Sequence, residues 1–132
     1  MDLKIGDKFS ATREITDELI RGFAELSGDY NPIHLDDEFA KGTRFERRIA
    51  HGMISGAFIS AVLGYEYKER KIVYLSQTMR FVAPAYIDDT ITTTAIVTNI
   101  REDKPIVTLE TICANQLGEI TVKGEAVVMI LN

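Results

Sequence analysis

The chain has 132 residues, of which 45% are hydrophobic and 27% charged, as in ordinary globular proteins. This length predicts a single domain over residues 1–132 that buries a core of its own. The formal net charge of −5 includes no block of basic residues, and no apolar run is long enough to span a membrane, which argues against nucleic acid and membranes as partners.

The first elements along the chain are predicted to be an edge strand and a helix. Residues Lys8 to Ile15 have the pattern of a short strand. Thr16 then offers an N-cap, with Asp17 and Glu18 in the first turn, where carboxylates interact favourably with the helix dipole. The apolar residues of this helix fall on one stripe: Leu19, Ile20, Phe23 and Leu26. Gly28 suits the helix end.

The next stretch, Ser27 to His34, reads Ser-Gly-Asp-Tyr-Asn-Pro-Ile-His and is predicted to be a bent loop without regular structure. Pro32 lacks a backbone donor and favours an extended conformation at Asn31. Such a constrained loop would present Asp29 and His34 as a candidate acid and imidazole pair. The alternative is a helix C-cap followed by a solvated turn, in which the Asp and Asn side chains bond to the nearby backbone.

A second buried helix is expected after a polar excursion. Asp36 to Lys41 suggests one short helical turn, and Gly42 to Arg48 a flap. Gly52 to Leu63 is apolar or small at every position, which predicts a helix buried on most sides. Its glycines are explained by close approach of other backbone, such as a sheet wrapped around it.

The remainder of the chain alternates with period two, which predicts strands. Four of them are expected, at Ile72–Val82, Thr90–Asn99, Ile106–Asn115 and Ile120–Leu131. The predicted architecture is therefore α+β, a curved and mostly antiparallel sheet wrapped around the helix at residues 52–63. Cys113, the single cysteine, cannot form an internal disulfide and is expected to pack as a small hydrophobe in one of these strands, which predicts a reducing compartment. Residues Met1 to Ser10 have no apolar signal core, so a cytoplasmic location is expected.

Three segments together resemble a known family. They are the Ser27–His34 loop, Ala50-His51-Gly52-Met53 at the start of the small-residue helix, and the run from Gln77 through Phe81 and Pro84 to Asp88. In this combination the chain is similar to the MaoC-like (R)-specific enoyl-CoA hydratases and 3-hydroxyacyl dehydratases. The resemblance implies a single hot-dog fold and the reversible syn addition of water to a trans-2-enoyl thioester.

That reaction needs a base, an acid and donors for the thioester oxygen. Asp29 and His34 match the family's catalytic pair. We favour Asp29 as the group that takes the water proton and His34 as the group that orients the water and donates to Cα, an assignment that the sequence leaves open. Asn31 is expected to brace the loop and the water.

The start of the central helix is expected to bind the thioester carbonyl. Gly52 and Met53 offer backbone N–H groups at the positive end of the helix dipole. His51, just before them, is expected to act as a cap or to brace the loop. Some family members have a serine in this helix facing the catalytic pair, and our alignment places Ala57 there. Ser55 and Ser60 are predicted to lie too far around or along the helix to replace it.

The sequence also bears on whether the protein binds phosphate groups, a metal or a cofactor. Arg44, Arg47 and Arg48 are candidates for binding the phosphates of coenzyme A or of a carrier protein's pantetheine arm, although a solvated loop is the alternative. No metal is expected, because a calcium loop needs an oxygen ligand where Ile33 stands and a glycine where His34 stands. No cofactor is expected beyond the coenzyme A or acyl carrier that forms part of the substrate.

Two further functions are weighed against the hydratase. A hot-dog thioesterase usually has a carboxylate on the central helix, and residues 52–63 contain no Asp or Glu. A non-catalytic acyl-thioester binding module would not need the acid and imidazole that this chain keeps. Because one sheet around one helix leaves a long edge and apolar surface, we also expect a homodimer or a dimer of dimers.

Overall fold

The computed structural model describes residues 3–66 and 71–131. In chain order its elements are β1 (Lys8–Glu14), α1 (Asp17–Ser27), α2 (Pro32–Leu35), α3 (Asp37–Lys41), α4 (Gly52–Glu66), β2 (Lys71–Phe81), β3 (Thr90–Ile100), β4 (Ile106–Ala114) and β5 (Ile120–Leu131). The predicted strands are all present, with ends within one residue of the expected positions. The central helix continues three residues beyond its predicted end.

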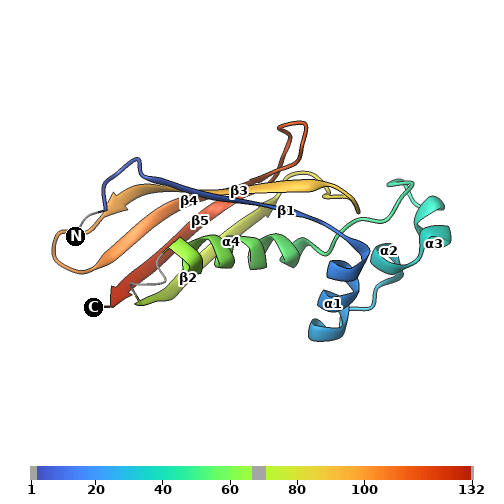
Figure 1. Cartoon of the computed structure of the whole chain (residues 1–132), viewed down its shortest axis with the longest axis horizontal. Coiled ribbons are helices and arrows are strands. Elements are labelled where there is room, and N and C mark those ends of the chain that lie inside the picture. Colours follow the sequence, from blue (N-terminus) through green and yellow to red (C-terminus); the bar gives the residue numbers. More distant parts are fainter. Residues whose placement is uncertain (1–2, 67–70, 132) are drawn as a thin grey trace.

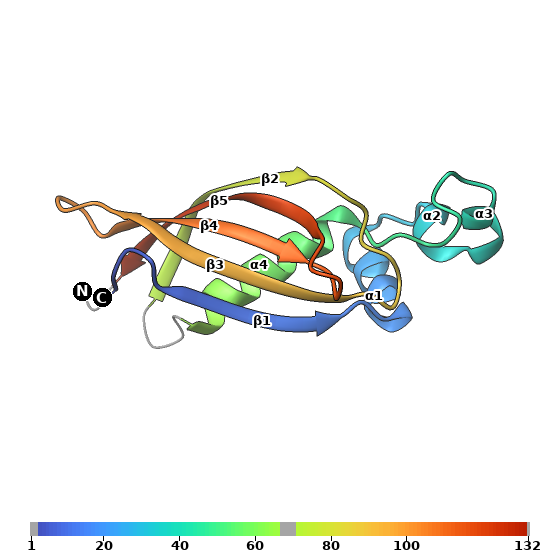
Figure 2. The same cartoon turned by 90° about the horizontal axis from the view of Figure 1, so that it is seen from above.

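The five strands form one antiparallel sheet in the order β1-β3-β4-β5-β2. The strands β3, β4 and β5 follow one another as hairpins, whereas β1 and β2 pair with the outer sides of β3 and β5 and become the sheet edges. The sheet curves around α4, which lies against its concave face (Figures 1 and 2). This arrangement confirms the predicted hot-dog fold.

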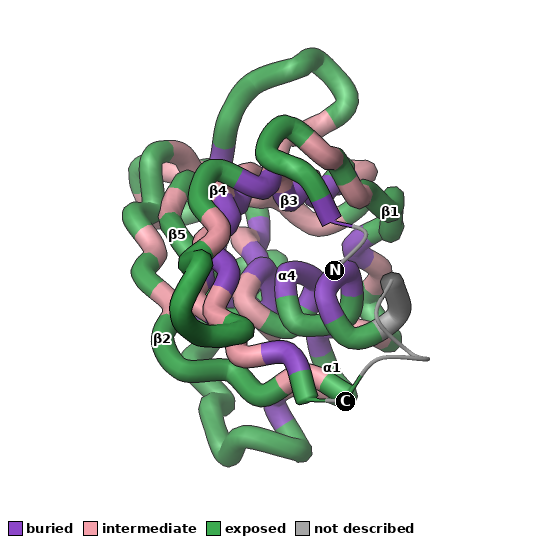
Figure 3. The backbone as a smooth tube through the Cα atoms, turned by 90° about the vertical axis from the view of Figure 1, so that its left-hand side faces the viewer, coloured by how far each residue is buried: buried purple, intermediate pink, exposed green. Residues whose placement is uncertain are grey.

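The core lies between α4 and the concave face of the sheet (Figure 3). Alternate residues of β4 are buried, and from the helix Ile54, Phe58 and Ile59 pack into the same cluster. Burial of each large aliphatic side chain contributes about 1.5–3 kcal/mol, so this layer supplies most of the driving force for folding. None of the helices in the described ranges is long and apolar enough to cross a bilayer.

The central helix is less covered than its composition predicts. One side is exposed in the single chain and carries mainly small residues: Met53, Ala57, Ser60, Ala61 and Gly64. A single curved sheet can cover only the side that faces it. The neighbours of its glycines also differ from the prediction, because a Cβ at Gly52 or Gly56 would meet the side chains of Phe81 or Met79 rather than backbone.

Helix α1 has the predicted caps. The Thr16 hydroxyl accepts a hydrogen bond from the Leu19 N–H at 3.0 Å, and Gly28 adopts a left-handed conformation with φ of 82°. The buried face consists of Ile20 and Ala24, whereas Leu26 is 84% exposed. The helix therefore turns the chain into the loop as expected, but its apolar stripe is only partly buried.

The close pairing of β2 and β5 requires Gly124. A Cβ at this position would overlap the backbone carbonyl of Thr78 on the neighbouring strand. We expect Gly124→Ala to lower the free energy of unfolding by about 3 kcal/mol, at the upper end of overpacking effects. Gly22→Ala is the matched control, since its Cβ meets no atom within 4 Å and a helical alanine is favourable. Denaturant titration measures both, and equal stability of the two variants would contradict the prediction.

Candidate active site

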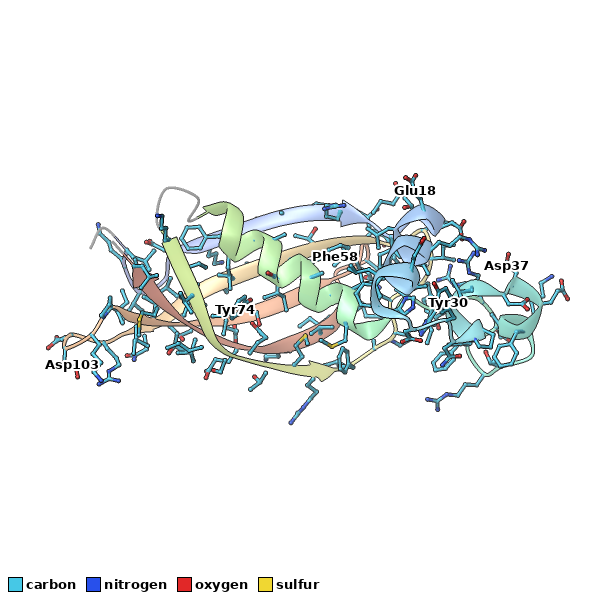
Figure 4. All side chains as sticks on the ribbon, turned by 90° about the horizontal axis from the view of Figure 1, so that it is seen from below. Glu18, Tyr30, Asp37, Phe58, Tyr74 and Asp103 are labelled. Atoms are coloured by element: carbon cyan, nitrogen blue, oxygen red, sulfur yellow. The ribbon has the colours of Figure 1, made fainter. Side chains whose placement is uncertain are left out.

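The helices α1 and α2 and the start of α4 meet at one end of the sheet (Figures 1 and 2). A cavity of about 390 Å³ lies at this junction. Its helical side is formed by His34, His51, Gly52 and Ser55, and its opposite side by the segment 81–85 that follows β2. Figure 4 shows Tyr30 at the same end, between α1 and α2.

The Ser27–His34 segment is more regular than predicted. Its last residues belong to α2, a single helical turn with Pro32 at its start, where the missing N–H costs nothing. The Asn31 side chain caps this turn by accepting a hydrogen bond from the Ile33 N–H at 3.2 Å. The Asp29 carboxylate accepts one from the Asn31 N–H at 3.2 Å. Asn31 thus braces the loop, and Asp29 is exposed at its surface.

His34 is buried on α2 and held in one orientation. Its Nδ1 lies 2.8 Å from the Ile49 carbonyl oxygen. Because a carbonyl only accepts, Nδ1 carries the hydrogen and Nε2 of the neutral ring has a free lone pair. Burial is the main cause that lowers the pKa of His34, and the nearby His51 and Arg48 lower it further, against the Ile49 carbonyl and Asp29, which raise it.

Three candidate groups come together at the rim of the cavity. A carboxylate oxygen of Asp29 and ring nitrogens of His34 and His51 all lie within 4.8 Å of one another. Asp29 does not itself line the cavity, but its carboxylate is close enough to His34 for one water to bridge the two through hydrogen bonds of about 2.8 Å. The sequence predicted the first two groups as the catalytic pair and His51 as a cap or a brace for the loop, and the fold brings all three together.

The same three groups are a poor fit for a metal ion. The two imidazole rings are stacked, with centroids 3.9 Å apart and an angle of 27° between planes. An ion bound to both would have to lie in the plane of each ring. Stacked rings do not meet this condition unless one rotates, and each ring is held by a hydrogen bond to a carbonyl.

The predicted carbonyl-binding groups lie at the start of α4. Gly52 and Met53 are the first residues of this helix, so their N–H groups have no acceptor inside it. Gly52 lines the cavity, opposite Phe81, whereas Met53 is not among the lining residues and its side chain is 54% exposed. Of the two predicted donors, Gly52 is therefore the better placed.

Ser55 is the serine of α4 that lines the cavity. The expectation that Ser55 is turned away was wrong, because it lies one turn after His51 and lines the cavity. Ala57 lines a different groove, next to α1, and Ser60 is exposed. The helical spacing of four residues from His51 was the signal that could have identified Ser55.

Cys113 lies behind Ser55 in the core. Its Sγ is 3.4 Å from the Thr93 hydroxyl. Burial raises the pKa of this thiol, against hydrogen bonds from Thr93 and Ser55 that lower it. A buried, protonated thiol is a poor nucleophile, as the sequence indicated.

The three arginines have different surroundings. Arg44 is exposed, lines the cavity and lies over the Phe45 ring at 4.9 Å. Arg47 lies over the ring of Tyr86 at 4.0 Å. Arg48 does not agree with the expected phosphate-binding role, because it is buried and its guanidinium bonds to Asp17 at 2.6 Å and to the His34 carbonyl oxygen at 2.7 Å. It links α1 to the candidate catalytic turn.

Arg48→Met should therefore destabilise the fold. The substitution removes a buried donor from the His34 carbonyl and a partner that lowers the pKa of Asp17. We expect a loss of about 2 kcal/mol, limited by the half-exposed position of Asp17. Arg21→Met is the matched control, since it removes the exposed partner of the same carboxylate and should cost about 0.5 kcal/mol. Thermal unfolding measures the stability of both variants. Similar losses of stability would refute the role of Arg48 as a buried link between α1 and α2.

The curved sheet around a central helix, with an acid and an imidazole at the start of that helix, defines a hot-dog fold with a candidate acyl-thioester site. The family model of the MaoC like domain matches residues 3–115, and the chain belongs to this family. It is 42% identical to an (R)-specific enoyl-CoA hydratase of Rhodospirillum rubrum, over 98% of this chain and 89% of the relative. It is 41% identical to one of Aeromonas caviae, over 97% and 96%. The solved structure of an (R)-hydratase from A. caviae superposes with a TM-score of 0.95 at 40% identity, covering 98% of both chains.

Proposed function

We propose that this protein is an (R)-specific enoyl-CoA hydratase, which adds water reversibly to a trans-2-enoyl thioester to form the (R)-3-hydroxyacyl thioester. The observation that carries the proposal is the separation between the Asp29 carboxylate and the His34 imidazole, which one water can bridge. The names of the two hydratases reported above, which are 42% and 41% identical to this chain, support the substrate class.

The chemistry follows from the two acceptors. A bridging water donates one hydrogen to the Asp29 carboxylate and the other to Nε2 of His34. As the water oxygen bonds to Cβ, one water proton passes to Asp29 or to Nε2 of His34. The group that accepted this proton then delivers it to Cα, and the second water hydrogen remains on the new hydroxyl. His34 can donate to Cα only after Nε2 has accepted a proton, which refines the role expected from the sequence. Delivery of both atoms from one side gives syn addition.

The thioester oxygen becomes negatively charged in this step. The Gly52 N–H at the start of α4 is placed to donate to it, and the helix dipole favours the same charge. Arg44 is exposed and lines the cavity, and it is our candidate for the phosphate contact of the coenzyme A or carrier arm.

The test is loss of the enoyl-thioester absorbance when purified protein is added to crotonyl-CoA. We expect hydration with the (R)-alcohol as product, assigned by chiral analysis. Release of the free coenzyme A thiol, measured in the same assay, serves as the control for hydrolysis. Hydrolysis without hydration, or binding without either reaction, would refute the proposal. The first result would favour a thioesterase and the second a binding module.

The geometry weighs against the thioesterase. Residues 52–63 of α4, the part of the helix that begins at the cavity, contain no Asp or Glu that could act as the carboxylate of a thioesterase. No observation in the described residues specifically favours the binding module.

Activity is expected to persist at mildly acidic pH. Burial lowers the pKa of His34 below the ordinary value of 6.5, so the ring stays neutral, and its Nε2 stays an acceptor, to a lower pH than in an exposed histidine. The acid limb of kcat/KM should therefore fall below pH 6.5. A pH profile on crotonyl-CoA measures this, with a limb above 6.5 as the contrary result.

We further propose that two copies of this chain form a homodimer. We also propose that the protein works in the cytoplasm and needs no cofactor beyond the coenzyme A or acyl carrier of its substrate. The support for the dimer is the exposed small-residue side of α4 together with the apolar edge residues Val73 and Leu75 of β2. Pairing two copies would cover both surfaces. Light scattering on the purified chain tests the proposal, and a monomer at micromolar concentration would contradict it.

A further inference from the structure

His51 contacts both members of the candidate catalytic pair. It is 3% exposed and lies between the last residue of the polar excursion and the start of α4. Its Nε2 is 2.9 Å from the Asp29 carbonyl oxygen, although the two residues are 22 positions apart in sequence. One face of its ring stacks on His34, with centroids 3.9 Å apart, and Phe23 packs against it at 4.9 Å.

The hydrogen bond to Asp29 defines which nitrogen of the His51 ring carries the hydrogen. Because the Asp29 carbonyl oxygen only accepts, Nε2 of His51 carries the hydrogen. The Nδ1 atom is buried and has no hydrogen-bond partner among the described residues. The described contacts of the ring are the hydrogen bond to Asp29 and the packing against His34 and Phe23.

We propose that His51 is the positioning residue that sets the distance between the Asp29 carboxylate and Nε2 of His34, through one hydrogen bond to the Asp29 backbone and one stacked face on the His34 ring. This inference rests on the proposed hydratase function, because the distance matters through the water that the pair would activate. Of the two roles expected from the sequence, a cap or a brace for the loop, the hydrogen bond to Asp29 agrees with the brace, and the stacking on His34 extends it to the second member of the pair.

The proposed role needs one side chain that both donates a hydrogen bond to the Asp29 carbonyl and stacks on the His34 ring. Few residue types can do both. A phenylalanine offers a flat ring without a donor, and a glutamine offers a donor without a ring. Asp29 is exposed on a loop whose own bonds are local, so without His51 the described contacts that connect it to His34 are lost. A shift of about 1 Å between reacting groups can cost on the order of 10²-fold in rate.

The charged and titratable groups that face His34 are few. They are Asp29 from the loop, Arg48 from the excursion and His51 from the start of α4. His51 is one of the causes that lower the pKa of His34, so its removal should raise that pKa. This gives a readout of the contact between the two rings, which a general loss of packing elsewhere in the core would not move, and kcat reports the positioning itself.

The experiment compares His51→Phe, which keeps the stacked ring, with His51→Gln, which keeps a donor. We expect each to lower kcat for crotonyl-CoA hydration by roughly 10- to 100-fold, with KM changed by less than about threefold because the Gly52 N–H is untouched. The acid limb of the pH profile should move to higher pH in both. Ile59→Val, a core substitution away from the cavity, is the control for general loss of packing and should keep the wild-type profile.

Nitrogen NMR of the two imidazoles provides a readout that does not depend on turnover. We expect the Nδ1–H form of His34 and the Nε2–H form of His51 in the wild type, and a raised His34 titration in both variants. Folded variants with wild-type kcat and an unmoved His34 titration would overturn the inference. If the wild type hydrates no enoyl thioester, the proposed function fails by itself, and the His34 titration still decides whether His51 controls its neighbour.

Discussion

Asp29→Asn is expected to lower kcat for hydration of crotonyl-CoA by about 10³-fold, within the range for loss of a general acid or base. The substitution is nearly isosteric, and the amide oxygen of asparagine can still accept from the Asn31 N–H, so the loop should keep its shape. What is lost is the negative acceptor that faces the bridging water. His34→Gln should have an effect of similar size, because Nε2 supplies the second acceptor.

The double variant, Asp29→Asn with His34→Gln, tests whether the two residues act on the same water. If Asp29 and His34 act on one water, their losses should be far from additive, as for residues that work as a unit. Asp37→Asn is the control, since it removes an exposed carboxylate of α3, outside the cavity. Initial rates with each variant, at equal folded fraction by circular dichroism, measure the effects. Retention of more than a tenth of wild-type activity by Asp29→Asn would exclude the proposed role.

Gly52→Pro should have the second largest effect on the reaction. Proline is tolerated at the first position of a helix and removes the N–H that we propose as the donor to the thioester oxygen. Loss of one such donor costs roughly 10²–10³-fold in kcat. The substitution also adds a Cβ, which would lie 2.7 Å from the Phe81 ring at the cavity.

Gly52→Ala separates these two consequences. It introduces the same Cβ against Phe81 but keeps the N–H, and the exposed Phe81 ring has room to move. We therefore expect the alanine variant to lose mainly affinity and the proline variant to lose turnover in addition. The kcat values for crotonyl-CoA measure the difference, and equal kcat in the two variants would remove the Gly52 N–H from the mechanism.

Much of the fold could be predicted because its determinants are local. The period-two pattern located the strands, Thr16 and Gly28 located the ends of α1, and the apolar composition located α4. These features depend on torsional preferences and on the spacing of apolar residues along a few turns of chain. The covered side of α4 was overestimated, because composition does not reveal that one sheet layer reaches only half of a helix.

The candidate site was only partly accessible to the same reasoning. Asp29 and His34 are five residues apart in a turn shaped by Pro32 and the Asn31 cap, so local chemistry predicted their proximity. Arg48 was grouped with its exposed neighbours Arg44 and Arg47, and its burial depends on Asp17 in a helix 31 residues earlier. Nothing in its immediate sequence distinguishes it from them.

The elements, their order and the acid–imidazole turn follow from the preferences of adjacent residues, so they could be predicted from the amino-acid sequence. Three other features became visible only in the folded chain: His51 contacts both Asp29 and His34, Arg48 is a buried anchor, and Ser55 lines the cavity. These contacts join segments 14 to 31 residues apart or depend on how α4 is rotated against the sheet. Such placement results from packing of the whole core, which no local pattern specifies.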